Sequence, residues 1–284
     1  MKDGIYLIID DENSRCGITD RLKTAVGLCY LAREHGVGFR FIHSAGFDIR
    51  DYLAPGRTDW SAELSDITAQ VSEKEEIRYL APYTDLPEFR KGRQYICREF
   101  IGNNILEKRN VPDWQRVWRE LFQDMFVPTD AVRKELEACA MPERYAAVAV
   151  RFINSLGHTE EADHNAPFSP EMQEKLIDAV LCRVAECEKQ SDAPVVVYSD
   201  SVRFLKAAAG KGYRVTDPAG VGNVMNRDAG EYVILRTFVN LFQMARAETV
   251  YSILHLEGFP ENSLYRTQYP RYAAVIGDRP FVRL

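Results

Sequence analysis

The sequence predicts an α/β protein built from two Rossmann-like, doubly wound domains that face each other across a cleft. Short apolar runs rich in β-branched and aromatic residues alternate with longer stretches that have the periodicity of helices. The alternation restarts after a connecting segment at 141–143. A chain of 284 residues is long enough for two such domains, which we expect at 1–140 and 141–284.

The N-terminal half opens with a β-α-β pattern. The run "GIYLIID" at 4–10 is too short for an amphipathic helix and predicts a buried parallel strand. Helical spacing follows over 19–35, where Thr19 or Asp20 is the expected N-cap, and "VGFRFIHS" at 37–44 predicts the next strand. The remaining elements of this half are a strand near 93–100 and helices near 112–126 and 128–140.

The C-terminal half repeats the alternation of strands and helices. Strands are expected near 145–152, 193–201, 213–217 and 248–254, and helices near 169–190, 201–213 and 229–247. The polar stretch between the first strand and the first helix of this half contains His158, Glu160 and Glu161. Loops of this length are uncommon inside compact domains and usually have a function.

Composition limits the classes of partner. The net charge is −6 and the sequence pI is about 5.5, and basic residues are interspersed with acids, so we expect no nucleic-acid partner. The six cysteines form no C-x-x-C pair, and no stretch of 18 apolar residues is present. We therefore expect a cytoplasmic protein without a transmembrane segment.

Ligands of doubly wound sheets bind beyond the carboxyl ends of the strands, so polar residues at these positions are candidate site residues. The first group is Asp10, Asp11 and Glu12, directly after the first strand. A haloacid dehalogenase-type phosphatase would need an Asp where Glu12 stands, and its later lysine and acidic pair are not evident. This phosphatase hypothesis is the weaker interpretation of the group.

Arg151 ends the first strand of the C-terminal half. Its planar guanidinium can donate two parallel hydrogen bonds to phosphate oxygens. A salt bridge between the domains would also explain an arginine at this position. Ser199, Asp200 and Ser201 follow the next strand, where they either cap a helix or bind an anion or a ribose. After the last predicted strand, we expect Ser263 to open a helix whose N-terminus could cradle a diphosphate.

In the order of these motifs the chain resembles the GDP-fucose-dependent fucosyltransferases, and this resemblance implies a GT-B-like arrangement of the two domains. The segment "CGITDRL", with Gly17 and Arg21, is similar to the family's glycine-containing loop with an N-R-L signature. In "VAVRF", Arg151 matches the arginine of the family's H-x-R motif, whereas Ala149 replaces the histidine. The "YSDS" segment matches a Ser/Thr-Asp pair at Ser199 and Asp200. The nearest matches to the family's closing region are Asp228, Ser252 and Ser263.

The resemblance implies an inverting glycosyltransferase that moves a sugar from GDP-fucose or a related GDP-sugar to a hydroxyl of a glycan. Arg151 would neutralise the diphosphate, and a carboxylate would take the acceptor proton, either one of Asp10, Asp11 and Glu12 or one of Glu160 and Glu161. The implied partners are the donor and the glycan acceptor, with no separate cofactor.

No D-x-D motif follows a predicted strand convincingly, so we expect the reaction to be independent of metal. The departure at Ala149 motivates an alternative, a catalytically degenerate relative that binds a nucleotide or a glycan without turnover. A scaffold that works only through protein contacts is a third possibility, which the polar clusters at several strand ends disfavour.

Overall fold

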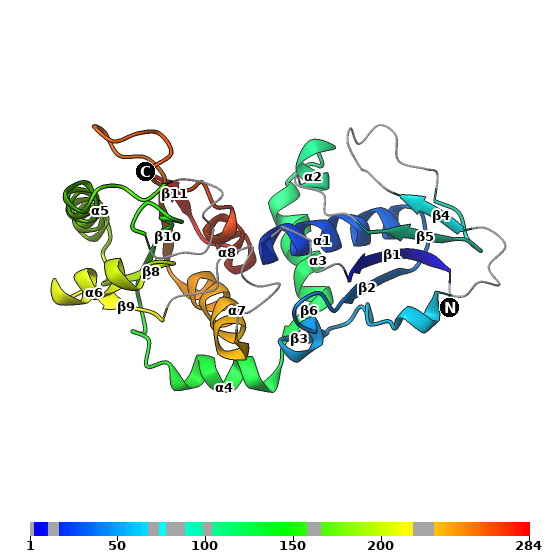
Figure 1. Cartoon of the computed structure of the whole chain (residues 1–284). Coiled ribbons are helices and arrows are strands. Elements are labelled where there is room, and N and C mark those ends of the chain that lie inside the picture. Colours follow the sequence, from blue (N-terminus) through cyan, green and yellow to red (C-terminus); the bar gives the residue numbers. More distant parts are fainter. Residues whose placement is uncertain are drawn as a thin grey trace. The chain divides into compact units, whose positions relative to one another are not determined.

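A computed structural model describes residues 3–10, 17–67, 89–98, 104–157, 166–217 and 230–284, together with the backbone of 74–77 (Figure 1). The described residues form two compact units, which meet in the chain between Thr129 and Asp130. Each unit contains a parallel β-sheet with helices packed on it, so the predicted α/β class with two Rossmann-like units is confirmed. None of the helices in the described part of the chain is both long enough and apolar enough to cross a membrane.

The first unit has a parallel sheet in the order β2-β1-β5-β4 and a separate antiparallel pair, β3 with β6. Its strands are β1 (Gly4–Ile9), β2 (Phe39–His43), β3 (Leu53–Pro55), β4 (Lys74–Ile77), β5 (Gln94–Cys97) and β6 (Phe126–Pro128). Its helices are α1 (Ile18–Glu34), α2 (Ile105–Lys108) and α3 (Trp114–Met125), with 3-10 turns η1 (Ile49–Asp51) and η2 (Leu64–Asp66).

All six residues of β1 are buried, which agrees with a central strand covered on both faces. Helix α1 packs on this strand and is itself covered by α2 and α3. The helix begins earlier than the sequence indicates: Gly17 is the N-cap, so the expectation of Thr19 or Asp20 is wrong. The reason is that the carbonyl of Gly17 accepts the first helical hydrogen bond, from the amide of Asp20 at 3.0 Å, which places Thr19 inside the first turn.

The second unit has five parallel strands in the order β11-β10-β7-β8-β9. They are β7 (Ala146–Val150), β8 (Val195–Ser199), β9 (Arg214–Val215), β10 (Thr249–Ile253) and β11 (Phe281–Arg283). The helices are α4 (Asp130–Ala138), α5 (Pro170–Gln190), α6 (Val202–Gly210), α7 (Glu231–Arg246) and α8 (Tyr269–Gly277). This is the strand order of a Rossmann sheet, and the direction of winding reverses between β7 and β10.

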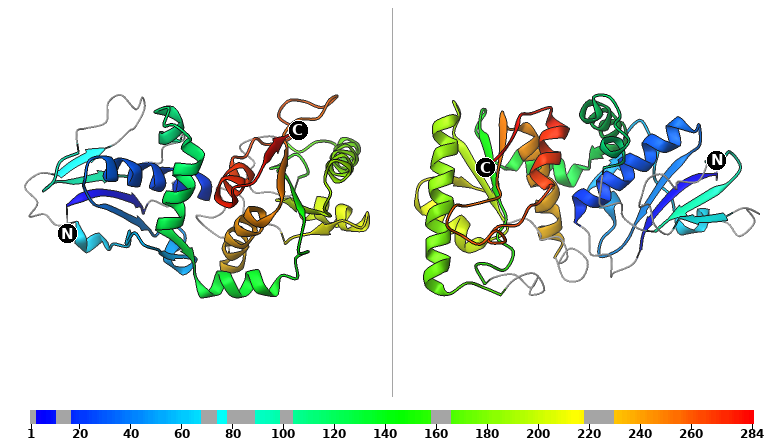
Figure 2. Two further views of the ribbon diagram at one scale, coloured as in Figure 1. Left: turned by 180° about the vertical axis from the view of Figure 1, so that it is seen from behind. Right: turned by 90° about the horizontal axis from the view of Figure 1, so that it is seen from above.

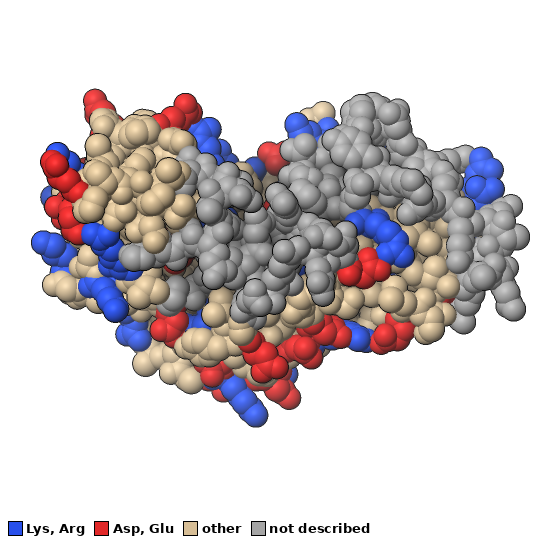
Figure 3. All heavy atoms as spheres, in the orientation of Figure 1, with Lys and Arg blue, Asp and Glu red and all other residues tan. Residues whose placement is uncertain are grey.

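Helices cover both faces of the second sheet (Figures 1 and 2). Helices α5 and α6 share a large apolar cluster with one face, to which Val148, Val197 and Tyr251 belong. Helices α7 and α8 pack against each other on the opposite face. Helix α4 contacts α7. In the sequence it follows the unit boundary at 129/130 and precedes the domain boundary expected at 140/141, so it belongs to the second unit. Figure 3 shows charged side chains of both signs along the lower edge of the view, where α4 lies.

The last turn of α8 lies against the end of α7 without room for a side chain. A Cβ atom added at Gly277 would lie 1.8 Å from the carbonyl oxygen of Ala245, so Gly277→Ala forces the two helices apart. We expect it to lower the free energy of unfolding by about 2–3 kcal/mol in urea denaturation. Gly210→Ala is the control: it meets no atom within 4 Å, and we expect it to be neutral or stabilising. Equal effects of the two substitutions would contradict this account.

Candidate functional site at the carboxyl ends of the strands

Arg151 stands at the point where the second sheet reverses its winding. It directly follows β7, whose neighbours are β8 and β10, and this is where ligands of Rossmann sheets bind. Its guanidinium carbon lies 4.6 Å from the centre of the Tyr265 ring, and its Nε atom is 4.0 Å from Oδ2 of Asp200. The side chain keeps 19% of its surface exposed. Asp200 belongs to the same unit, and its contact with Arg151 is longer than a hydrogen bond.

Asp200 holds the turn that follows Arg151. Its two carboxylate oxygens accept hydrogen bonds from the backbone amides of Phe152, at 2.9 Å, and Ile153, at 2.8 Å. Ile153 has φ +51°, a strained conformation for a β-branched residue. Burial raises the pKa of Asp200, whereas the amide of Phe152, the charge of Arg151 and the amide of Ile153 lower it and offset part of this rise. Asp200 thus fixes the turn next to Arg151, and its contact with a ligand stays a prediction.

Residues 260–265 are tied to the same end of β7. The hydroxyl of Ser155 donates to the carbonyl of Ser263 at 2.9 Å, and the amide of Tyr265 donates to the carbonyl of Arg151 at 2.8 Å. These two bonds hold the half-exposed Tyr265 ring over Arg151. Ser263 does not open a helix, so that expectation is wrong: its hydroxyl closes a turn to Pro260, and α8 begins only at Tyr269.

The serines around Asp200 have structural roles. The Ser201 hydroxyl accepts from the amide of Phe204 and caps α6, so the helix-cap interpretation is confirmed for this residue. The Ser199 hydroxyl accepts from the amide of Ser201 at 3.2 Å and donates to Asp200 at 3.3 Å. The polar cluster seen in the sequence is thus a hydrogen-bonded turn that supports Asp200.

Ser252 lies inside β10, beneath the site rather than at its edge. It pairs in register with Ala149, which in turn pairs with Tyr198, so the three side chains share one face of the sheet. This is the face covered by α7 and α8. The Ser252 hydroxyl and the Gln243 side-chain amide are buried and make no hydrogen bond to other residues of the described part. Ala149, where the related family has histidine, therefore lies in a buried polar layer.

In the first unit, Gly17 and Arg21 begin α1, and Arg21 is fully buried. Its Nη1 donates to Nε2 of His43, whose Nδ1 donates to the carbonyl of Phe47 at 3.0 Å. Burial, followed by the charge of Arg21, lowers the pKa of His43 to about 3, so the imidazole is neutral. Arg21 is therefore enclosed, and it orders the residues around the end of β2.

Asp10 follows β1 and accepts a hydrogen bond at 2.5 Å from Arg98, which follows β5. These two strands flank the reversal point of the first sheet. Asp11, Glu12, Asp228, His158, Glu160 and Glu161 all lie outside the described residues. Within the described ranges, no three His, Cys, Asp or Glu side chains form a group that could hold a metal ion.

No family model and no curated protein sequence matches the chain. Its structure matches crystal structures of the α-1,6-fucosyltransferase NodZ, one from Bradyrhizobium, one soaked with GDP-fucose and one co-crystallised with GDP. The match covers 96% of this chain and 92% of NodZ, with a TM-score of 0.58 and 14% sequence identity. The chain has the NodZ fold.

Two residues near the strand ends, one in each unit, are not part of any motif recognised in the sequence. Tyr265 lies far from Arg151 in the chain, and the hydrogen bond between their backbones, together with that from Ser155 to Ser263, holds the ring over the guanidinium. His43 could have been noticed because it ends a predicted strand, as ligand-facing residues often do. Its pairing with Arg21, however, depends on how α1 packs on β2.

The buried neutral state of His43 predicts a pH dependence of stability. Its folded-state pKa of about 3 lies below the unfolded value near 6.5, so the unfolded chain binds the proton first as pH falls. The contribution of neutral His43 to the free energy of unfolding is fully present above about pH 6.5. We expect about 2 kcal/mol of this free energy to be lost when the pH falls to 4.5. Urea denaturation across this range should show a shallower pH profile for His43→Gln, which keeps an acceptor for Arg21. The exposed His35→Gln should leave the wild-type profile unchanged, and an unaltered profile in His43→Gln would refute the assignment.

Removing the Asp200 carboxylate should release the turn after β7. Asp200→Ala leaves the amides of Phe152 and Ile153 without their acceptor, so we expect a loss of about 2–4 kcal/mol of unfolding free energy. Hydrogen exchange of these two amides, followed by NMR, should accelerate. Asp178→Ala, an exposed position on α5, is the matched control and should change neither quantity. Unchanged exchange at 152 and 153 would contradict the proposed positioning role.

Proposed function

We propose that the chain is a glycosyltransferase of the fucosyltransferase type, which transfers a sugar from GDP-fucose or a related GDP-sugar to a glycan hydroxyl. The observation that carries the proposal is the place of Arg151, partly exposed at the reversal point of the second sheet in a NodZ-like fold. NodZ itself has been crystallised with GDP and soaked with GDP-fucose, which supports a nucleotide-sugar donor.

In the proposed reaction the acceptor oxygen attacks the anomeric carbon while the bond from that carbon to the diphosphate breaks, which inverts the configuration. The leaving diphosphate gains negative charge, and a guanidinium at hydrogen-bond distance stabilises it. The 4.0 Å separation from Asp200 means that this carboxylate does not hold Arg151 in a bidentate pair. A protein carboxylate takes the acceptor proton, with Asp11, Glu12, Glu160 and Glu161 as candidates. No metal ion is required in this proposal.

The residues that the family resemblance assigns to binding of the GDP-sugar divide into two groups by their burial and contacts. Arg151 is suited to touch the diphosphate, whereas Ser199, Asp200 and Ser263 support it through the turns described above. The hydroxyl of Ser252 and the guanidinium of Arg21 are enclosed in their units, so we assign them supporting roles. Gly17 at the start of α1 and Asp228 remain predictions, as do a cytoplasmic location and the lack of a nucleic-acid partner.

A second candidate function is binding of a nucleotide or glycan without turnover. Ala149 favours it, because a methyl group stands where the related family has a histidine two residues before the arginine of its H-x-R motif. Incubation with GDP-fucose and a glycan mixture distinguishes the two. Sugar transfer identifies an enzyme, whereas saturable GDP binding without transfer or donor hydrolysis identifies a binding protein.

The donor site is tested by ligand-dependent melting. We expect GDP at 100 times its Kd to stabilise the protein by about 2.7 kcal/mol, seen as a rise in Tm. In calorimetric titrations, Arg151→Ala should bind GDP about 10- to 100-fold more weakly, because the charged guanidinium no longer donates hydrogen bonds to the diphosphate. Arg203→Ala is the control, an arginine of the same unit that pairs with Glu174 on the surface. If no nucleoside diphosphate raises Tm, or if Arg151→Ala binds GDP normally, the proposed donor site is wrong.

A further inference from the structure

A pocket of about 310 Å³ opens in the first unit beside the end of β2. Segment 60–62 runs alongside β2, because the amide of Phe41 donates to the carbonyl of Trp60 at 2.8 Å. This segment and η1 form opposite walls. The apolar lining includes Ile42, Ile49 and Ala62, which are all buried, whereas the rim is polar. An apolar surface with a few fixed polar groups is typical of small-molecule sites.

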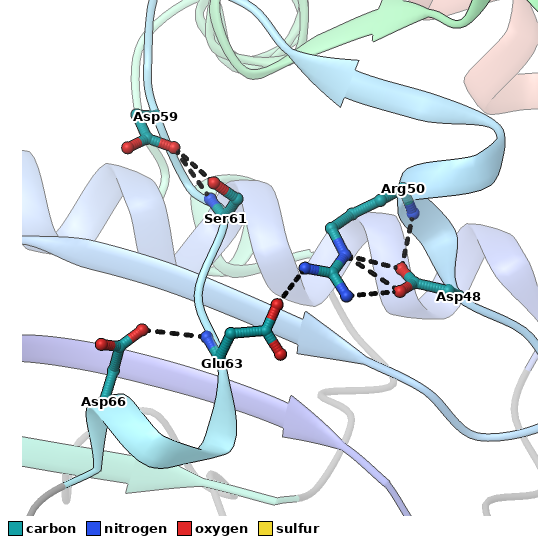
Figure 4. Close-up of polar contacts among 6 residues, drawn as sticks. All are labelled: Asp48, Arg50, Asp59, Ser61, Glu63 and Asp66. Carbon is teal, nitrogen blue, oxygen red and sulfur yellow. Dashed lines mark hydrogen bonds and ion pairs between the residues drawn. The ribbon is translucent and has the colours of Figure 1, made fainter.

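The polar rim is a single arginine held between two carboxylates, as Figure 4 shows. Nε of Arg50 lies 2.9 Å and its Nη2 2.6 Å from Oδ2 of Asp48, and its Nη1 donates to Glu63. The bridge connects η1 to the start of η2 across the pocket. Three residues on two separate turns are thereby fixed as one surface.

Each carboxylate of this rim is also anchored at its own backbone. Oδ1 of Asp48 accepts the amide of Arg50 at 2.9 Å and caps η1. The amide of Glu63 donates to Asp66 at 2.9 Å in a capping box that starts η2 (Figure 4). Because these side chains are already ordered, a ligand that binds them loses little additional conformational entropy.

The rim retains both donors and acceptors for a ligand. A guanidinium has five N–H groups. Among the residues that the structure describes, Asp48 accepts from one N–H on Nε and one on Nη2, and Glu63 accepts from one on Nη1, so each terminal nitrogen keeps one N–H for a ligand. The carboxylate oxygens keep further lone pairs. Ser44 and Ser65 add exposed hydroxyls to the lining. Alternating donors and acceptors of this kind match vicinal hydroxyl groups.

The charge of the rim selects against acids. Asp48 and Glu63 outweigh the one positive charge of Arg50, and His43 in the wall is neutral because burial lowers its pKa to about 3. The positive charge of Arg21 lies behind His43, whereas Asp48 and Glu63 face a ligand directly, so a carboxylate or a phosphate beside these two side chains is disfavoured. Leu64, which is 49% exposed at the rim, gives an apolar surface for the face of a ring.

We propose that this pocket binds one sugar ring without an acidic group, with its hydroxyls on Arg50 and Glu63 and a face on Leu64. The pocket volume is at the low end of the range for ligand sites, which suits a single ring. The inference rests on the proposed function, of which it names the acceptor class: a glycan that is neutral or carries an amine at this position.

The experiment is an NMR titration of the whole chain that follows the Nε–H signal of Arg50. The probes are cellotriose, the trimer of glucosamine and trigalacturonate. We expect the first two to shift the signal saturably and the acidic trimer to bind at least 10-fold more weakly. Binding of all three with equal affinity, or of none, would overturn the proposal.

Variants separate the pocket from general effects on the surface. Measured by calorimetry, because Arg50→Ala lacks the NMR signal, Arg50→Ala and Leu64→Asp should each weaken cellotriose binding at least 10-fold. Leu64 is exposed, so its substitution does not threaten the fold. The matched control is Arg116→Ala on α3, where the arginine also bridges two carboxylates, Asp113 and Glu120, at 2.7 and 2.8 Å. Wild-type affinity in both pocket variants would refute the site.

GDP binding measured in the same samples distinguishes the two proposals. If sugars bind at the pocket but GDP does not bind, the pocket is a glycan-binding site and the proposed transferase function is wrong. GDP binding that depends on Arg151, without sugar binding at Arg50, would support the transferase and reject this pocket.

Discussion

The second unit depends on one buried carboxylate. Asp200 leaves β8 and accepts two backbone amides from the residues after β7, so it joins the ends of two neighbouring strands. Burying a carboxylate is costly unless hydrogen bonds and a positive charge surround it, and here Phe152, Ile153 and Arg151 provide them. The same bonds hold Ile153 in a strained conformation, so the position of Arg151 is fixed at the expense of local backbone energy.

The two units place an arginine near the carboxyl ends of their strands in different environments. Arg21 is enclosed and donates to a neutral histidine, so its charge orders the interior around β2. Arg151 is partly exposed, stacks on Tyr265 and contacts Asp200 only at 4.0 Å. Its partial exposure makes Arg151 the better candidate for an anionic ligand, although the two arginines look equivalent as sequence matches.

The strands β1, β2, β5, β7, β8, β9 and β10 and the longer helices before α8 could be predicted from the sequence, because apolar runs and capping residues act locally. The short strands β3, β4 and β6 were not expected. Ser169 and Ser201 do cap the helices that follow them. The helix expected at Ser263 fails because its hydroxyl binds Pro260 instead, a competition between turn and cap that composition does not resolve. The terminal strand β11 was not expected, since three residues carry too little periodicity to be recognised.

The sequence by itself determined the α/β class, the repeated alternation and the placement of Arg151 after a strand, because these follow from local periodicity and from the chemistry of one side chain. Only the tertiary structure decided the function of the surrounding polar groups. Asp200 supports a turn, Tyr265 covers the guanidinium, and Arg50 joins Asp48 to Glu63 across a pocket. Each of these contacts joins residues from separate elements, and their geometry is set by how the sheets and helices pack, which no local pattern encodes.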